Sequence, residues 1–352
     1  MTITLASLAD LKARAFDDII DVRSPSEYAE DHLPGAINLP VLDDEERARI
    51  GTIYKQVSTF DARKIGAALV ARNSAAHIEG PLADRPGGWR PLVYCWRGGQ
   101  RSGSFATILA GIGWRVEVLD GGYRSWRRLV AEAVHDRPVA SPVIVLGGDT
   151  GSAKTELLNM LPERGVQVID LEGLANHRGS LFGGMGGQPS QKAFESTLAM
   201  VLERLDPARP VVVESESARI GDLALPARLW AAMKTAPRIL LEAPVAARSE
   251  YLIRAYRDII DDHDRLGRTI DALRPYQPVE IIKEWHRLAG AGAYADLAAD
   301  LVIRHYDPRY RKHRARMETP VTGIAADDLS PQALPALADH LARIILKAGG
   351  DE

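Results

Sequence analysis

Cysteine is almost absent from this chain of 352 residues, in which Cys95 stands alone. One thiol cannot form a disulfide within the chain, and it cannot build a cysteine-rich metal site. Stability must therefore come from ordinary apolar cores. A length of 352 residues with 46% hydrophobic residues is enough to bury a core in each of two domains.

An excess of charge of either sign is also lacking. The 44 Lys and Arg residues nearly balance the 47 Asp and Glu residues, which leaves a formal net charge of −3. Contact with a polyanion would therefore need a local basic patch. No apolar run approaches the roughly 20 residues that span a bilayer, and residues 1–16 do not resemble a signal peptide. We expect a cytoplasmic enzyme without a membrane partner.

Short apolar runs alternate with helical patterns, which is typical of parallel α/β sheets. In the first part, strands are predicted over residues 18–22, 91–94 and 114–119, and helices over residues 43–80 and 101–111. A polar stretch with two prolines follows and predicts a linker over residues 135–142. The strands predicted beyond it cover residues 143–146, 166–169, 210–213 and 238–241. From residue 258 onward the pattern is mainly helical.

Cys95 ends a predicted strand and is followed by glycines and the start of a helix. The glycines let backbone N–H groups point inward, and the helix N-terminus adds a positive dipole end. With the charges of Arg97 and Arg101, these features predict a catalytic thiol of lowered pKa that lies beside a bound anion. An inert buried cysteine is the alternative, which the polar neighbours disfavour. The predicted anion loop consists of Arg97, Gly98, Gly99, Gln100, Arg101 and Ser102.

A second anion site is predicted where a strand runs through Gly148 into a helix, the context of a phosphate-binding loop. Lys154 and the backbone amides are expected to hold a diphosphate, and Thr155 to ligate a magnesium ion. Ala153 replaces the usual glycine, and we expect it to be tolerated because alanine suits a helical φ. The predicted diphosphate-binding residues are Gly148, Asp149, Thr150, Gly151, Ser152, Ala153, Lys154 and Thr155.

Two carboxylates are candidates for an acidic group beside this ion. Glu214 directly follows an apolar strand and is the first candidate, and Asp170 is the second. Either residue could instead serve only as a cap at the end of its strand.

Several stretches around the cysteine loop have a familiar order. They are Asp21-Val22-Arg23, residues 32–40, and Asp120-Gly121-Gly122-Tyr123 with Trp126. They resemble the beginning and end of a rhodanese (sulfurtransferase) domain. Five residues separate Cys95 from Arg101, a spacing shared by protein tyrosine phosphatases and rhodanese-like phosphatases. The common sulfurtransferase loop is one residue shorter, so this loop predicts a pocket for a group bulkier than a bare sulfur.

Further stretches in the second part carry a closer resemblance. They are residues 171–180, residues 188–191 with Phe194 and Glu195, and residues 214–217 with Arg219-Ile220-Gly221. Together with the two anion loops, they resemble the tRNA 2-selenouridine synthase family over most of the chain. The resemblance implies an α/β fold, with a rhodanese-like domain at residues 1–135. A P-loop NTPase-like parallel-sheet domain with a helical tail would occupy residues 136–352.

The resemblance also implies a tRNA-modifying transferase that acts on wobble 2-thiouridine in two steps. Geranyl diphosphate first alkylates the sulfur, and selenium from selenophosphate then replaces the geranylthio group. The family ties its rhodanese cysteine, here Cys95, to the selenium step. tRNA and the selenophosphate donor are thus the expected partners, Mg²⁺ is the expected ion, and no tightly bound cofactor is expected.

A tRNA-binding enzyme of this charge needs a basic patch, and residues 304–316 are the one dense basic segment. Tyr306 and Tyr310 lie among its arginines, a composition that suits phosphate contacts with base stacking. A solvated charged face is the alternative. The predicted tRNA contacts are Arg304, Arg309, Arg311, Lys312, Arg314 and Arg316. An extension of the patch is predicted at Arg248, Arg254 and Arg257, with the last two on one side of a helix.

Two other functions are compatible with these motifs. A P-loop kinase or ATPase with a regulatory rhodanese domain would turn over nucleotide without tRNA and independently of Cys95. A phosphatase would use the five-residue spacing from Cys95 to Arg101, but it would need a general-acid carboxylate above the loop and would leave the second part of the chain unexplained.

Overall fold

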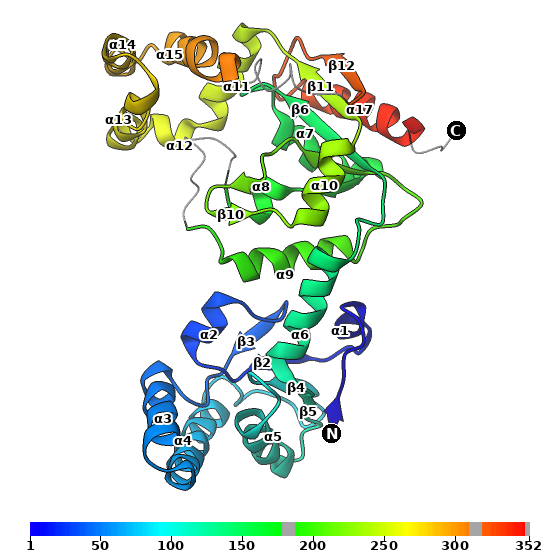
Figure 1. Ribbon diagram of the computed structural model, residues 1–352, viewed down its shortest axis with the longest axis vertical. Coiled ribbons are helices and arrows are strands. Elements are labelled where there is room, and N and C mark those ends of the chain that lie inside the picture. The colour runs from blue at the N-terminus through cyan, green and yellow to red at the C-terminus, as the bar shows by residue number, and fades with distance from the viewer. Residues whose placement is uncertain (178–186, 310–318, 349–352) are drawn as a thin grey trace. The chain divides into compact units, whose positions relative to one another are not determined.

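The computed structural model describes the whole chain except residues 178–186, 310–318 and 349–352 (Figure 1). The chain forms two compact units. The first comprises residues 1–137 and 189–204, and the second comprises residues 138–188 and 205–352. The domain limits proposed from the sequence stay a prediction. Residues 189–204, which the sequence grouped with the second domain, belong to the first unit here.

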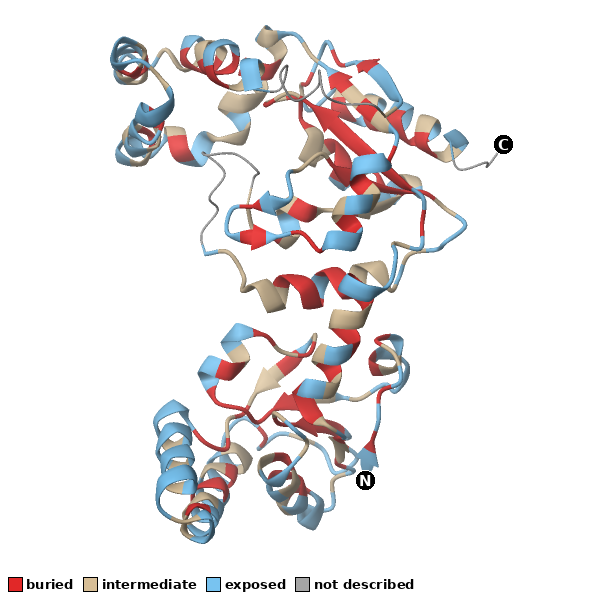
Figure 2. Ribbon diagram, viewed as in Figure 1, coloured by how far each residue is buried: buried red, intermediate tan, exposed pale blue. Residues whose placement is uncertain are grey.

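A five-stranded parallel sheet with the order β1-β5-β4-β2-β3 forms the centre of the first unit. Its strands are β1 (Thr2–Ile3), β2 (Asp18–Asp21), β3 (Ala36–Asn38), β4 (Pro91–Tyr94) and β5 (Glu117–Leu119). The strands predicted over residues 18–22 and 91–94 are confirmed, and the third predicted strand begins only at Glu117. β4 is buried along its length (Figure 2) and leads directly into Cys95.

Helices surround this sheet. They are α1 (Ala9–Ala13), α2 (Pro25–Glu30), α3 (Asp44–Gln56), α4 (Thr59–Glu79), α5 (Gln100–Ile112), α6 (Gly122–Ala131) with its π-helical extension η1 (Glu132–Asp136), and α9 (Gln191–Leu202). Local chemistry explains their starts. Asp43 and Glu46 form a capping box at α3, and Pro25 occupies the first turn of α2 behind a capping box made by Ser24 and Glu27. The helices predicted over residues 43–80 and 101–111 are thus confirmed.

The second unit has its own five-stranded parallel sheet, with the order β12-β11-β6-β8-β7. Its strands are β6 (Val143–Gly148), β7 (Gln167–Ile169), β8 (Val211–Glu214), β11 (Arg238–Glu242) and β12 (Val321–Ala325). A small hairpin pairs β9 (Arg219–Ile220) with β10 (Leu223–Ala224). The sequence did not predict β12, because this edge strand is largely exposed and lacks an apolar run.

The helices of the second unit form two groups. Around the sheet lie α7 (Lys154–Met160), η2 (Pro162–Arg164), α8 (Leu171–Leu174), α10 (Ala227–Thr235), α11 (Val245–Ala255) and α17 (Leu334–Ala348). The predicted helical region contains α12 (Arg257–Ile260), α13 (His263–Asp271), η3 (Arg274–Tyr276), α14 (Val279–Gly290), α15 (Tyr294–Leu301) and η4 (Val302–Tyr306). This second group has a separate core around Ile270, Leu273 and Trp285, each 0% exposed.

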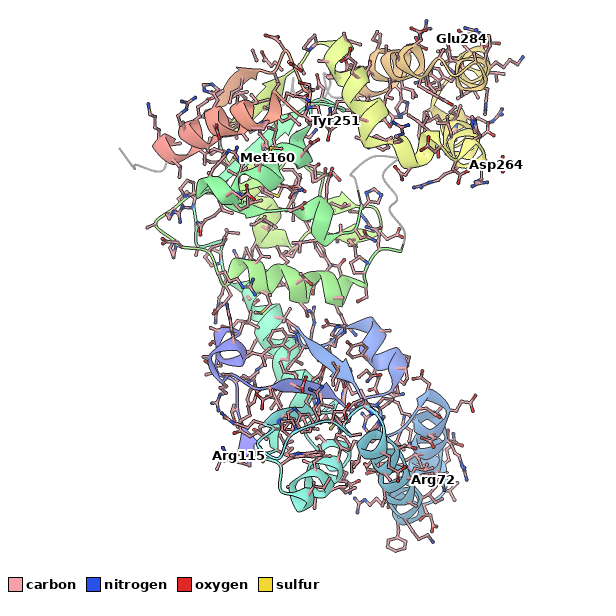
Figure 3. All side chains as sticks on the ribbon, turned by 180° about the vertical axis from the view of Figure 1, so that it is seen from behind. Arg72, Arg115, Met160, Tyr251, Asp264 and Glu284 are labelled. Atoms are coloured by element: carbon pink, nitrogen blue, oxygen red, sulfur yellow. The ribbon has the colours of Figure 1, made fainter. Side chains whose placement is uncertain are left out.

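Charged side chains lie on the outside of both units. Arg72 and Arg115 in the first unit, and Asp264 and Glu284 in the second, are exposed and point away from the ribbon (Figure 3). Within the described residues, no helix combines the length and the apolar character needed to cross a bilayer.

Candidate functional site

Cys95 lies at the carboxyl end of β4, and its side chain faces the N-terminus of α5. The residue is only 3% exposed. Its Sγ accepts a hydrogen bond from the Ser102 hydroxyl at 3.2 Å and one from the Gly99 amide at 3.3 Å. Burial raises the pKa of the Cys95 thiol, but the hydrogen bonds from Ser102 and from the Arg97 and Gly99 amides outweigh it, so that the pKa falls below its usual value.

Two glycines allow the cysteine loop to pack against the turn that precedes α6. Gly98 has φ +66° and Gly122 has φ +56°. A Cβ atom on Gly98 would lie 2.7 Å from the Leu119 carbonyl oxygen, and one on Gly122 would lie 2.2 Å from the Cys95 carbonyl oxygen. The Tyr123 amide donates to that same Cys95 oxygen at 2.8 Å. The two backbone segments can therefore approach this closely only because Gly98 and Gly122 lack a Cβ atom.

Of the two arginines of the loop, Arg101 has a partner other than the thiol. Arg101 donates to the Glu27 carboxylate at 2.9 Å, and Arg47 also pairs with Glu27 at 2.9 Å. Glu27 is 8% exposed and needs these cations because an unpaired buried carboxylate is costly. Arg97 is exposed, as are Gly99 and Gln100. The donors that face the sulfur are thus amides and a hydroxyl, whereas the Arg101 guanidinium neutralises a neighbouring acid.

The structure shows what Arg23 of the Asp21-Val22-Arg23 stretch does, which the sequence did not reveal. Arg23 is 0% exposed. Its Nη2 donates to the Asp21 carboxylate and to the Asp31 carbonyl oxygen, each at 2.6 Å. The guanidinium also lies 4.1 Å from the centre of the Tyr123 ring. A buried arginine therefore joins the end of β2 to the residue that follows α2 and to the first turn of α6.

In the second unit, the predicted phosphate loop connects β6 to α7. Gly148 and Gly151 have φ values of +159° and +84°. Ala153 has φ +58° and ψ +24°, so it adopts the left-handed conformation. The expectation of a helical φ at Ala153 is therefore wrong. An L-residue with a Cβ atom pays roughly 1–2 kcal/mol in this region, which explains why related loops use glycine here.

The polar side chains of this loop point to different partners. The Lys154 Nζ donates to the Gly148 carbonyl oxygen at 2.9 Å and the Asp149 carbonyl oxygen at 3.3 Å. The Thr155 hydroxyl donates to the Glu172 carboxylate at 2.7 Å. The Ser152 hydroxyl is buried and has no hydrogen-bond partner among the described residues. A lysine and two hydroxyls thus lie on one short turn, a composition that suits a bound diphosphate.

Of the two predicted acids, only Glu214 is deeply buried, at 1% exposed. Burial, together with the charges of Asp170 and Glu172, raises its pKa well above the usual value, although the Glu172 amide donates to it at 2.5 Å. Asp170 accepts a hydrogen bond from the Gly173 amide at 2.7 Å and so caps the N-terminus of α8. Asp170 therefore caps a helix and not the end of its strand, and its place beside an ion stays a prediction.

Glu172 and Glu216 complete this acidic group, although neither was predicted to lie beside the ion. Burial, together with the charge of Glu172 and a hydrogen bond to it, raises the pKa of Glu216 to about 8, although Lys154 lowers it. The available signal was their place in the chain: Glu172 follows β7 and Glu216 follows β8, and the carboxyl ends of neighbouring parallel strands meet at one edge of a sheet.

The oxygen atoms at this edge suit a magnesium ion, which prefers carboxylate and hydroxyl ligands. Glu214 Oε2 is buried and has no hydrogen-bond partner among the described residues. Within the same residues, no group of three or more His, Cys, Asp or Glu side chains is arranged to hold a metal. An ion bound here would thus share its ligands with diphosphate oxygens and water, as Mg²⁺ commonly does.

The predicted tRNA contacts lie only partly within the described residues, since Arg311, Lys312, Arg314 and Arg316 fall outside them. Arg304 forms an ion pair with Asp300 at 2.7 Å. The Arg309 guanidinium lies 4.8 Å from the centre of the Tyr276 ring. Burial, with the nearby charge of Arg309, lowers the pKa of His305 to about 4, so His305 adds no positive charge to this segment at neutral pH.

The predicted extension of the basic patch is wrong for Arg248. This residue is 2% exposed, and its guanidinium pairs with Asp149 at 3.2 Å and Asp307 at 2.7 Å. Arg254 and Arg257 do not share a helix, because α11 ends at Ala255 and α12 begins at Arg257. Arg248 instead links the phosphate loop to the residue that follows η4.

Comparisons with known proteins agree with this architecture. The rhodanese-like domain family matches residues 4–129, and the tRNA 2-selenouridine synthase AAA domain family matches residues 141–277. The chain is 34% identical over 344 residues to the tRNA 2-selenouridine synthase of Chromohalobacter salexigens. This alignment covers 88% of this chain and 91% of that protein. It is 32% identical over 326 residues to the enzyme of Shewanella loihica, with 83% and 86% covered.

Fold and sites together define an α/β protein in which a rhodanese-like domain is joined to a P-loop-type domain with a helical tail. The enzyme of the same name from Sulfurovum sp. is 35% identical over 324 residues, with 83% of this chain and 87% of that protein covered. The chain belongs to the tRNA 2-selenouridine synthase family, as its resemblance predicted.

Proposed function

We propose that this protein converts wobble 2-thiouridine in tRNA to 2-selenouridine, by geranylation followed by selenation. In the first step, the sulfur of 2-thiouridine forms a bond to C1 of geranyl diphosphate, the C1–O bond breaks, diphosphate leaves, and N3 of the base releases its proton to water. The loop of residues 148–155 binds the diphosphate, and Lys154 exchanges its contacts with the Gly148 and Asp149 carbonyl oxygens for contacts with phosphate. A magnesium ion beside Thr155 would further neutralise the leaving group.

In the second step, selenium from selenophosphate forms a bond to C2 of the base. The C2–S bond breaks, and geranylthiol takes up a proton as it leaves. Water accepts the phosphoryl group, so that phosphate and 2-selenouridine remain. The cysteine loop binds and orients the selenophosphate anion beside Cys95, whose Sγ accepts hydrogen bonds from the Ser102 hydroxyl and the Gly99 amide before α5. Contacts of tRNA with Arg304, Arg309 and the basic residues that follow belong to this proposal.

One observation carries the assignment of the selenium step to the first unit. The Cys95 thiol is almost fully buried, and yet hydrogen bonds lower its pKa. An inert core cysteine would have a raised pKa, because burial alone disfavours the thiolate. A lowered pKa in a buried position requires a set of donors arranged for negative charge, which is the property that an anionic selenium donor needs.

The test separates the two steps with a single substitution. Cys95→Ser is incubated with tRNA and geranyl diphosphate and then with selenophosphate, and the tRNA nucleosides are measured by mass spectrometry. We expect geranylated 2-thiouridine to accumulate at the wild-type rate and 2-selenouridine to be lost. Ser104→Ala, an exposed substitution on the same helix α5, serves as the control and retains both steps. Selenation by Cys95→Ser at the wild-type rate would contradict the assignment.

A further inference from the structure

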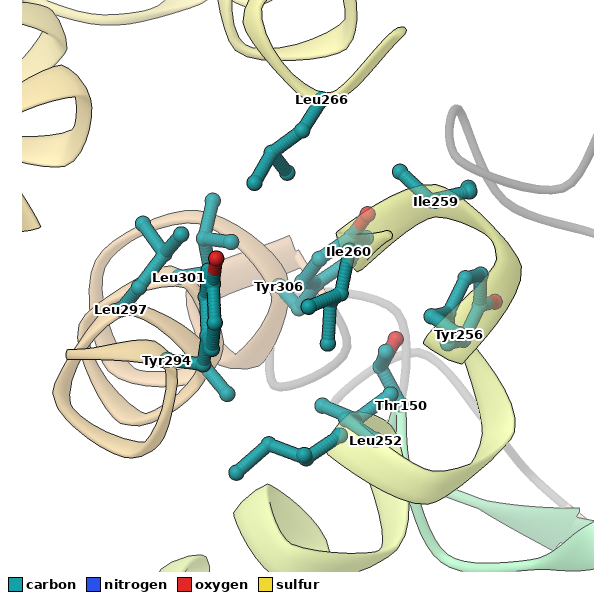
Figure 4. A pocket seen from close by; sticks show the side chains of 12 residues that line it. Thr150, Leu252, Tyr256, Ile259, Ile260, Leu266, Tyr294, Leu297, Leu301 and Tyr306 are labelled. Atoms are coloured by element: carbon teal, nitrogen blue, oxygen red, sulfur yellow. The ribbon is translucent and has the colours of Figure 1, made fainter. Parts of the chain in front are cut away.

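An apolar pocket in the second unit begins at the phosphate loop (Figure 4). Thr150 of the loop reaches its wall next to Leu252 of α11, and α15 forms another wall through Leu297, Ala298 and Leu301. The space between the lining side chains is about 540 Å³, including the part open to solvent.

Direct packing connects this pocket to the diphosphate site. A Cβ atom on Gly151 would lie 2.9 Å from the Leu252 side chain and 3.0 Å from the Arg248 carbonyl oxygen, so α11 presses against the loop. Arg248 also pairs with Asp149 in the loop and with Asp307 after η4. The pocket wall and the loop are therefore held together by both packing and charge, and a ligand could occupy the two at once.

The chemistry of the lining selects among diphosphate ligands. Aliphatic side chains of leucine, isoleucine and alanine make up most of the wall, and tyrosine rings at Tyr256, Tyr294 and Tyr306 make up much of the rest. A nucleoside would bury its base edge and ribose hydroxyls in such a pocket, where polar groups that lack partners are costly. An unsaturated hydrocarbon chain has no such groups and gains from every apolar contact.

We propose that this pocket holds the hydrocarbon chain of a prenyl diphosphate while the loop of residues 148–155 holds its diphosphate. This proposal rests on the proposed function. It adds the location of the donor's hydrocarbon chain. It follows that the pocket distinguishes donors by chain length: a ten-carbon chain fills it further than a five-carbon chain, and inorganic pyrophosphate does not enter it. Nucleoside diphosphates bind more weakly than geranyl diphosphate.

Filling the pocket tests this assignment. In Ala298→Trp, a large side chain enters the pocket from α15, and in the control Ala295→Trp the same side chain lies on the exposed side of that helix. Calorimetry with geranyl diphosphate, dimethylallyl diphosphate and inorganic pyrophosphate gives the affinities. We expect Ala298→Trp to reduce the affinity for geranyl diphosphate at least ~10-fold, because several methylene contacts are lost. Pyrophosphate affinity is unchanged, and Ala295→Trp matches the wild type for all three ligands.

The outcomes separate this inference from the proposed function. Wild-type affinity of Ala298→Trp for geranyl diphosphate would overturn the pocket assignment while leaving the function intact. If the wild type binds neither geranyl diphosphate nor pyrophosphate, the proposed function fails and the pocket assignment fails with it. Ala298→Leu provides a smaller filling should tryptophan unfold the unit. This variant is expected to lose more affinity for geranyl diphosphate than for dimethylallyl diphosphate. An equal loss of affinity for both would also overturn the assignment.

Discussion

At the scale of single residues, a prediction from residue type fails where the backbone conformation or a distant partner decides what the residue does. The loop around Cys95 was predicted from residue types alone, and its lowered thiol pKa agrees with that prediction. Ala153 was misjudged because a residue name does not reveal φ, and the left-handed conformation follows from the chain's turn into α7. Arg101 was assigned to the thiol because the sequence does not show that Glu27, distant in the chain, requires its charge.

The strain at Ala153 gives a prediction of stability. Ala153→Gly removes the roughly 1–2 kcal/mol penalty of a left-handed alanine and incurs the smaller entropic cost of glycine, about 0.5–1 kcal/mol. Urea unfolding should therefore show a stability equal to the wild type or higher by about 1 kcal/mol. Ala231→Gly, in the exposed interior of α10, is the control and should lose about 1 kcal/mol. Equal losses in the two variants would show that Ala153 carries no strain.

At the scale of elements, periodicity and caps predicted most helices and strands, because each depends on neighbouring residues. The capping boxes before α2 and α3 and the apolar runs of β4 and β6 are of this kind. β12 escaped prediction because pairing with β11 defines it, not its own composition. The assignment of α9 to the first unit likewise depends on contacts between residues far apart in the chain.

The meeting of β7 and β8 at one sheet edge gives a prediction about pH. Folding raises the pKa of Glu216 from its usual value of 4.5 to about 8. The folded state therefore retains a proton that the unfolded chain releases between these values. Its contribution to stability is complete below about pH 4.5 and is lost as the pH rises through 8. In Glu216→Gln, the free energy of unfolding should decline less than in the wild type between these two pH values. Urea unfolding across this pH range measures the difference.

The prediction for Glu216 has a control at the surface of the same unit. Glu284→Gln removes an exposed carboxylate that pairs with Arg287, and the pH dependence above pH 5 should then match the wild type. If Glu216→Gln also keeps the wild-type pH dependence, Glu216 is ionised in the folded protein and the acidic group must be arranged differently.

At the scale of the whole molecule, family membership could be inferred from the sequence because two anion loops and several specific stretches occur in one chain. Comparison with tRNA 2-selenouridine synthases then confirmed the family. The apolar pocket could not be inferred, because its wall combines Thr150 of the loop with residues of α11 and α15 that lie about 100–150 positions further along. Only the folded chain brings an apolar surface to a phosphate loop whose sequence alone also fits nucleotides.

The two anion sites are proposed to serve consecutive steps on one base, and the variant Lys154→Ala separates these steps. This variant is given tRNA with 2-thiouridine and geranyl diphosphate, or tRNA that is already geranylated and selenophosphate. Mass spectrometry of the nucleosides should show geranylation reduced at least ~100-fold, since the Lys154 cation no longer stabilises the leaving diphosphate, and selenation at the wild-type rate. Geranylation at the wild-type rate, or selenation that falls together with it, would show that the two sites do not serve separate steps.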